Sequence, residues 1–360
     1  MNFAQTPLQL EYNAIGMELY PTLSQLKYTK FIEVPIIRPH LNVRDQWKNP
    51  DIAPGIQTNA WRASNPSIII YKLNNVKYYL VNCRLVNYHQ EGHSFVGMDC
   101  DHIKTRNVLL LLTEDFECVD TTELFNFTYK VSHNTWIHGQ EDLRLCLLSD
   151  NKRLGFTCVT YDNYSHQVIP RISIGTCMPQ FKYETYCCDL QEVHTKNGLR
   201  TEKNWIPFLN KKNEFCVVYN FHPMTIFNLE NNSWTERPAN PNYSYHRGGT
   251  SFVDFEYKSM KGKLCVVHHV HDIPHKSRLY FHRFLWFSKD YFEDEEEICE
   301  DKIFQTYYSE PFYLMHINVE FCSGLTESID GKQFILTGGV RERIPSMLLI
   351  EKETIYNMLN

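Results

Sequence analysis

The chain has 360 residues, with 42 acidic and 36 basic side chains, a formal net charge of −6 and no cluster of basic residues. This balance argues against a nucleic-acid-binding surface, which would show as a stripe of Lys and Arg. No apolar stretch is long enough to span a membrane, and the N-terminus lacks the basic and apolar regions of a secretory signal, so we expect a cytoplasmic protein.

A pattern of three strands repeats along most of the chain. Its clearest part is an apolar stretch, rich in β-branched and aromatic residues, that follows a turn signal such as Asn74-Asn75 or Asp330-Gly331. These stretches are residues 77–84, 153–160, 214–219, 263–269 and 332–339, and the other turn signals are at 150–151, 212–213 and 261–262. Each stretch predicts the second strand of a hairpin.

Each hairpin has a first strand that starts with polar residues and is followed by a third strand. The polar starts are at 65–67, 141–144, 203–205, 247–250 and 321–324, and the third strands are at 108–112, 168–174, 224–227, 279–287 and 347–350. Radial repetition of small sheets protects their edges. We therefore expect an all-β chain that forms a single five-bladed β-propeller. Its blades cover about residues 61–120, 138–190, 200–240, 245–292 and 308–352, and residues 1–60 supply a cap and a ring-closing strand.

Most of the 12 cysteines lie in apolar strand stretches, as Cys83, Cys158, Cys216 and Cys265 do. A reduced thiol in such a place behaves as a small hydrophobic group, so we expect all of them to be free.

The strongest chemical candidate is the segment 139–144, with the sequence GQEDLR. Side chains alternate along a strand, so Asp142 and Arg144 share one side while Glu141 points to the other. We predict that Asp142 is the functional acid and that Arg144 orients it or tunes its pKa. The alternative is a structural salt bridge between blades, because ion-pair networks perturb carboxylates too.

A second candidate opens the next blade. Lys203, Asn204 and Trp205 combine a cation, an amide and an aromatic ring. Together they suit an anionic or hydroxyl-rich ligand, with Trp205 as a stacking face. The alternative is a turn lysine beside a core tryptophan.

The fourth blade offers a possible oxyanion site. Arg247 precedes two glycines whose backbone amides are open to approach, and the paired strand ends in His268 and His269. Neighbouring residues on a strand point to opposite faces, so we expect these histidines to hydrogen-bond a ligand rather than hold a metal. A structural role for them is the alternative.

Three further residues are expected at the channel mouth. Asn65 and Arg84 belong to the first blade, and Glu342 belongs to the fifth. Glu342 is a candidate second carboxylate, with an exposed loop residue as the alternative.

The order of these motifs resembles that in family-130 glycoside hydrolases and phosphorylases, and in the related propeller-type β-mannosyltransferases and glycosyltransferase-like proteins of large DNA viruses and bacteria. The likeness covers about residues 60–350, and its order is more specific than any one motif. It implies a five-bladed propeller that acts on β-mannosides with inversion. The family's general acid, in a Glu-Asp-Pro-Arg motif, maps onto Asp142. Its phosphate-holding lysine and histidine map onto Lys203 and onto His268 or His269.

The sequence departs from the family at several positions. Leu143 replaces the proline, Glu342 replaces an aspartate, and the phosphate-binding arginines after Asp142 have no assigned counterpart, although residues 163–167 lie about where one is expected. The sequence therefore leaves open whether the reaction at the glycosidic bond is transfer, phosphorolysis or hydrolysis. We expect no bound cofactor, a small-molecule or oligosaccharide substrate, and inorganic phosphate or a nucleotide sugar as co-substrate. The alternative is a non-catalytic propeller that binds a glycan or a protein.

Overall fold

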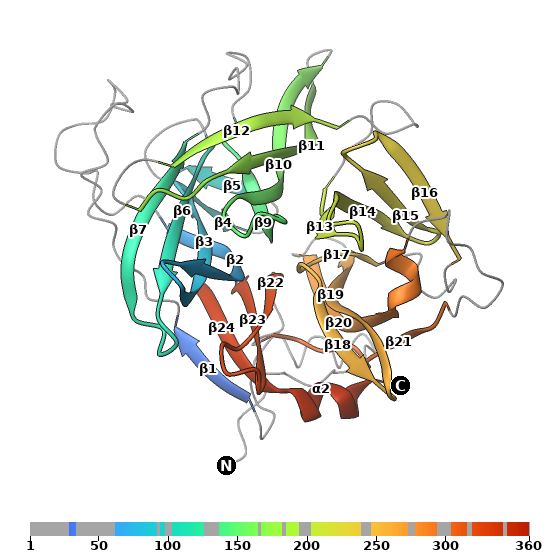
Figure 1. Cartoon of the computed structure of the whole chain (residues 1–360). Coiled ribbons are helices and arrows are strands. Elements are labelled where there is room, and N and C mark those ends of the chain that lie inside the picture. The colour runs from blue at the N-terminus through green and yellow to red at the C-terminus, as the bar shows by residue number, and fades with distance from the viewer. Residues whose placement is uncertain are drawn as a thin grey trace, which may run out of the picture.

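The structure, a computed structural model, is all-β apart from two short helices in the part of the chain that it describes. It describes residues 29–33, 62–91, 94–97, 103–125, 137–164, 167–181, 185–193, 203–238, 246–272, 278–293, 304–314, 319–340 and 344–359. The helices in these ranges are the 3-10 helix η4 (Lys289–Phe292) and the α-helix α2 (Lys352–Met358). The sheets stand around a common centre, with their first strands innermost (Figure 1).

The largest sheet begins with an antiparallel meander and continues into a second one. Its order is β2 (Arg62–Leu73), β3 (Val76–Val86), β6 (Ile103–Leu112), β7 (Cys118–Phe125), β12 (Thr185–Glu192), β11 (Gln167–Cys177), β10 (Leu154–Tyr164) and β9 (Glu141–Leu147). The short β8 (Ile137–His138) pairs with β6, and β4 (Tyr88–Glu91) pairs with β5 (Ser94–Gly97). The two meanders meet at β7 and β12, which are parallel and share only the pairs Thr185–Leu124 and Tyr186–Phe125.

Three smaller sheets complete the ring (Figure 1). One is β13 (Ile206–Leu209), β14 (Phe215–Phe221), β15 (Met224–Asn228) and β16 (Ser233–Arg237). The next is β17 (Arg247–Gly248) and β18 (Val253–Tyr257), both paired with β19 (Met260–Asp272), then β20 (Arg278–Ser288) and β21 (Thr306–Tyr308). The last is β22 (Glu320–Glu327), β23 (Gln333–Val340), β24 (Ile344–Glu351) and β1 (Thr29–Glu33).

The N-terminal strand β1 lies on the outer edge of the last sheet. It pairs with β24 in antiparallel register, from Thr29 opposite Ile350 to Glu33 opposite Ser346. The first and the last described strands therefore pair in one sheet, and this pairing holds the ring together there (Figure 1).

Apolar side chains fill the space between neighbouring sheets. Leu80 and Leu109 of the first meander, for example, pack with Leu145 and Phe156 of the second. At the closure, Val81 and Cys83 of β3 pack with Ile335 and Met347 of the last sheet. Middle strands such as β3 and β23 are thus buried on both faces, which explains why their sequences are apolar almost without alternation, whereas the outer strands β7 and β16 keep partly exposed positions.

The hairpins expected from the sequence are present, but one turn lies elsewhere. The turn of the fourth hairpin was expected at 261–262, whereas the structure places it at Lys258 and Ser259, which both have positive φ. Residues 261–262 instead pair with Glu256 and Phe255 within the ladder. The turn was missed because Lys and Ser are not the residues that usually supply a two-residue turn of positive φ.

Candidate active site

The innermost strands are interrupted where they approach the centre. Extra residues break the register of β2 between Ser64 and Ser67, of β9 opposite Thr157 to Val159, and of β22 between Cys322 and Gly324. Asn65 (φ 40°), Asp142 (φ 50°) and Asn204 (φ 68°) take left-handed conformations at these places or just before β13. Asn and Asp tolerate this conformation better than other side chains. Because a bulge changes the direction of a side chain, residues from several sheets meet at one point.

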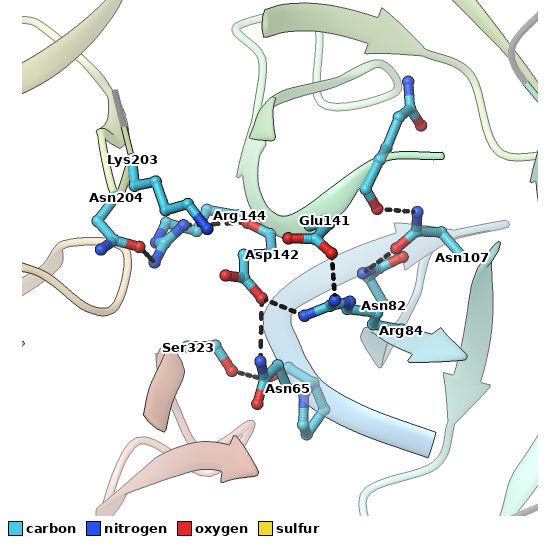
Figure 2. Close-up of polar contacts among 12 residues, drawn as sticks. Asn65, Asn82, Arg84, Asn107, Glu141, Asp142, Arg144, Lys203, Asn204 and Ser323 are labelled. Carbon is cyan, nitrogen blue, oxygen red and sulfur yellow. Dashed lines mark hydrogen bonds and ion pairs between the residues drawn. The ribbon is translucent and has the colours of Figure 1, made fainter. Parts of the chain in front are cut away.

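Asp142 lies in the middle of this meeting point. Its Oδ1 accepts hydrogen bonds from Asn65 Nδ2 at 2.9 Å and from Arg84 Nη1 at 3.0 Å. Its Oδ2 receives no hydrogen bond from any residue that the structure describes, and Figure 2 shows it turned away from Asn65 and Arg84. The side chain is 15% exposed. One oxygen is therefore held in place while the other is open to a ligand.

The neighbouring carboxylate, Glu141, has both oxygens occupied. Oε1 accepts from Arg84 Nη2 at 2.7 Å, and Oε2 accepts from the Tyr161 hydroxyl at 2.6 Å. The Arg84 guanidinium, which is almost fully buried, also donates to the Tyr88 hydroxyl. Arg84 thus bridges two consecutive carboxylates (Figure 2), and only Asp142 keeps an oxygen that is free to react.

The charges around Asp142 keep it ionised. Burial acts to raise the pKa of Asp142, but Arg84, Arg144, the hydrogen bond from Asn65 and the charge of Lys203 together outweigh that effect. The pKa of Asp142 is therefore held below its ordinary value. At neutral pH the free oxygen is a hydrogen-bond acceptor and a potential base.

Arg144 connects three sheets at the centre. It donates to the backbone oxygen of Asp142 at 3.0 Å, to Asn204 Oδ1 at 2.9 Å and to the backbone oxygen of Gly249 at 2.7 Å. Burial lowers the pKa of Arg144 to about 10, and the charge of Asp142 opposes this, so the guanidinium stays positive at neutral pH. Arg144 holds the backbone of Asp142 and contributes charge, rather than pairing with the carboxylate.

Lys203 is exposed beside this network. Its ammonium donates to the Tyr161 hydroxyl at 3.1 Å and lies 5.5 Å from the centre of that ring. Tyr161 is 9% exposed, and burial together with the charge of Glu141 raises its pKa well above the ordinary value. Tyr161 is therefore protonated and joins Lys203 to Glu141. The sequence interpretation did not find it.

The cationic and histidine residues of the fourth hairpin lie in different environments. The Arg247 side chain is exposed and forms no hydrogen bond or ion pair with the described part of the chain. Its register partner His268 is 1% exposed, packs against Phe321, and has an Nδ1 with no hydrogen-bond partner. Burial, followed by the charges of nearby residues, lowers the pKa of His268 well below its ordinary value, so it is neutral. His269 points to the opposite face, toward His246 and away from His268.

Trp205 is not a stacking face for a ligand, and this expectation was wrong. The side chain is 0% exposed and packs edge-on against Tyr219 and Trp234, with ring centres 5.1 and 5.9 Å away. Its backbone oxygen accepts a hydrogen bond from Thr157. A fully buried ring has no face to offer, so Trp205 is part of the core beneath the site.

Comparison with known proteins gives similarity in structure only. No protein-family model and no curated protein sequence matches the chain. A GDP-Man-dependent mannosyltransferase from Leishmania mexicana aligns over 96% of this chain and 94% of its own, with a TM-score of 0.50 and 10% identity. The chain shares the fold of that mannosyltransferase. The resemblance inferred from the order of the motifs is therefore confirmed at the level of the fold.

Two phosphorylase structures are also similar. A mannose phosphorylase from Leishmania mexicana aligns over 84% of this chain and 88% of its own, with a TM-score of 0.49 and 11% identity. A β-1,2-mannobiose phosphorylase from Listeria innocua aligns over 86% and 97%, with a TM-score of 0.48 and 11% identity.

The structure brings most of the predicted residues together. Asn65, Arg84, Glu141, Asp142, Arg144 and Asn204 form one contact network (Figure 2), and Lys203 joins it through Tyr161. Arg247 and His268 lie on the adjoining sheet, and Glu342 lies outside the described residues. The described residues contain no group of three or more His, Cys, Asp or Glu that would hold a metal ion, and no helix among them is long and apolar enough to cross a membrane.

Besides Tyr161, the sequence interpretation missed the residues that support Asn65. Ser323 Oγ and Thr337 Oγ1 both donate to the backbone oxygen of Pro66. A Cβ at Gly339 would lie 2.3 Å from Asn65 Oδ1, so this glycine is what lets Asn65 approach the last sheet. The polar residues at 321–324 and the Gly338-Gly339 pair can be recognised in the sequence, but the sequence does not show that they contact Asn65 and Pro66.

Proposed function

We propose that the chain is a carbohydrate-active enzyme that makes or breaks a glycosidic bond, with Asp142 as its general acid or base. The observation that carries this proposal is the asymmetry of Asp142, whose Oδ1 is fixed by Asn65 and Arg84 while Oδ2 has no partner among the described residues. The neighbouring carboxylate, Glu141, has both oxygens committed to Arg84 and Tyr161 and keeps none for a substrate. A carboxylate held in this way is suited to proton transfer.

The architecture we propose is a five-bladed β-propeller. The pairing pattern contains five antiparallel units, if the large sheet is divided at the narrow parallel contact between β7 and β12. On this division the last blade is completed by β1. Its centre is then where the first strands of all the blades converge, and β9, the strand that carries Asp142, is one of them (Figure 1).

The substrate class we propose is a β-mannoside or a similar sugar, with a phosphorylated co-substrate. The fold is shared with a mannosyltransferase that depends on GDP-Man. Lys203 and Arg247 are exposed cations, and Lys203 adds to the field at Asp142. Cations placed this way suit the phosphate of a sugar phosphate or of a nucleotide sugar.

Among the possible reactions, the site best supports inverting transfer. An acceptor hydroxyl would attack the anomeric carbon while the bond from that carbon to the phosphate oxygen breaks, and the phosphate would leave with the electron pair. Asp142 Oδ2 would take the hydroxyl proton, which requires the ionised carboxylate that its lowered pKa provides. Phosphorolysis is the reverse reaction, in which a protonated Asp142 would return the proton.

Hydrolysis has less support from the geometry. An inverting hydrolase needs a second carboxylate that activates water. Glu141 cannot serve, because Arg84 and Tyr161 occupy both of its oxygens. The other candidate, Glu342, lies outside the described residues.

The test is to incubate the protein with a panel of nucleotide sugars, sugar 1-phosphates and β-manno-oligosaccharides and to identify the products. The products distinguish transfer, phosphorolysis and hydrolysis in one experiment. Asp142→Asn should lower turnover by about 10²- to 10⁴-fold while sugar binding persists. Unchanged turnover in Asp142→Asn would remove the proposed role. No turnover by the wild type, together with tight glycan or protein binding, would favour a non-catalytic binding propeller.

A further inference from the structure

We infer that Tyr161 is a positioning residue that holds the Lys203 ammonium where it can bind the anionic group of the co-substrate. Tyr161 also connects that ammonium to Glu141 and Arg84, which lie beside Asp142. The inference rests on the proposed function, since it assigns how the same site receives an anion. Tyr161 lies on β10, while Lys203 directly precedes β13 on the neighbouring sheet. The contact therefore joins two sheets.

The direction of each hydrogen bond in this chain is determined by chemistry. An ammonium only donates and an ionised carboxylate only accepts. The Tyr161 hydroxyl therefore accepts from Lys203 at 3.1 Å and gives its one proton to Glu141 Oε2 at 2.6 Å. Arg84 then donates to Glu141 Oε1 at 2.7 Å and to Asp142 Oδ1 at 3.0 Å. The Lys203 ammonium is thus connected to Asp142 by a continuous series of hydrogen bonds.

Lys203 retains donors for a ligand. An ammonium carries three N–H groups, and one of them is used by Tyr161. The described residues provide no acceptor for the other two, and the side chain is exposed to solvent. A free lysine on a surface would sample many rotamers, so anchoring by Tyr161 removes part of the entropy that binding an anion would otherwise lose.

The anchored ammonium also acts on Asp142 by charge. The charged and titratable groups around Asp142 are Arg84 on β3, Glu141 and Arg144 on β9, Tyr161 on β10, and Lys203 before β13. An anion bound to Lys203 would offset one of these positive charges. Filling the anion site would therefore make the Asp142 carboxylate a stronger base at the moment when the sugar donor is in place.

The experiment is a calorimetric titration of inorganic phosphate, and separately of GDP, into the wild type, Tyr161→Phe, Lys203→Met and the double variant. Tyr71→Phe is the matched control, because its buried hydroxyl donates to the backbone oxygen of Lys152, a turn residue. We expect Tyr161→Phe to bind the anion about tenfold more weakly, the double variant to bind no more weakly than Lys203→Met, and the control to bind as the wild type does.

Kinetics give a readout that a purely structural role would not change. With an active substrate, Tyr161→Phe should raise KM for the anionic co-substrate about tenfold and change kcat less. The acid limb of the pH–activity profile of Tyr161→Phe should lie at higher pH than that of the wild type, because Asp142 loses part of the positive field that keeps it ionised.

The outcomes separate this inference from the proposed function. If the wild type binds phosphate or GDP and Tyr161→Phe binds it equally well, the positioning role is wrong and the proposed function stands. If the wild type binds neither anion, the inference is wrong and the phosphorylated co-substrate falls with it, while Asp142→Asn still tests the catalytic role by itself. If Tyr161→Phe does not fold, Lys203→Met decides the matter, since wild-type affinity in that variant would show that the anchored ammonium is not the anion site.

Discussion

Arg84 offers the most direct test of how the site is built. Its side chain is 2% exposed and lies 2.7 Å from Glu141 and 3.0 Å from Asp142. Arg84→Met keeps an unbranched apolar stem but leaves two consecutive carboxylates without their shared cation. Breaking a buried ion pair from one side destabilises a protein by about 3–5 kcal/mol. Because Asp142 is 15% exposed and keeps other cations nearby, we expect about 3 kcal/mol at pH 7.

The loss of stability caused by Arg84→Met should depend on pH, in a direction that follows from the pKa of Asp142. In the wild type the pKa of Asp142 is lower in the folded state than in the unfolded state, so the carboxylate contributes stability above the unfolded pKa. That contribution is lost as the pH falls through the folded pKa. Arg84→Met removes the largest of the charges that lower this pKa. The difference in unfolding free energy between the two proteins should therefore be smaller at about pH 3 than at pH 7.

Urea denaturation followed by tryptophan fluorescence measures this difference at both pH values. Arg153→Met is the control, since Arg153 pairs with Asp150 on the surface and is 56% exposed, and it should change stability by at most about 1 kcal/mol. Adding Glu141→Gln to Arg84→Met should restore part of the loss, because one of the uncompensated charges disappears. A loss below about 1 kcal/mol, or an equal loss at both pH values, would refute the argument that Arg84 neutralises both carboxylates.

Three further predictions concern the site and the core beneath it. Gly339→Ala should lower turnover by about a hundredfold, because the new Cβ would lie 2.3 Å from Asn65 Oδ1 and displace it. Gly331→Asn is the control and should leave turnover unchanged, because Gly331 lies in a turn where a Cβ would have only Glu327 Oε1 nearby, at 3.8 Å. Trp205→Ala should lower the unfolding free energy by about 3–5 kcal/mol without changing the sugar affinity of the folded protein, and weaker binding at full stability would contradict its assignment to the core. In the transfer direction, the kcat/KM profile should show the acid limb of Asp142 below about pH 4, and a limb near pH 6 would argue against a base whose pKa is lowered.

The sequence was most informative where structure is local. The strands follow from apolar stretches and turn residues, and turns such as Asn74-Asn75 were identified because asparagine accepts positive φ. The turn at Lys258 and Ser259 was misplaced, since neither residue carries that signal. The order of the hairpins also indicated a radial arrangement, but not the edge contact between β7 and β12.

The chemistry of the site depended on contacts between distant segments. Alternation along a strand correctly separated His268 from His269, because that rule needs only neighbouring residues. It failed at Asp142, where the bulge and the positive φ change the direction of the side chain. Tyr161 was missed for a similar reason, since nothing in its own strand shows that Lys203 and Glu141 lie on either side of it.

The sequence by itself determined an all-β chain, the strands and hairpins, and a list of polar residues at the starts of the first strands. Only the tertiary structure decided which of those residues meet, because contacts between sheets depend on bulges and packing that no local pattern encodes. It separated the open carboxylate of Asp142 from the fully bonded Glu141, and it placed Trp205 in the core. The difference between Asp142 and Glu141 is set by Arg84, Tyr161 and Asn65, each brought from another strand.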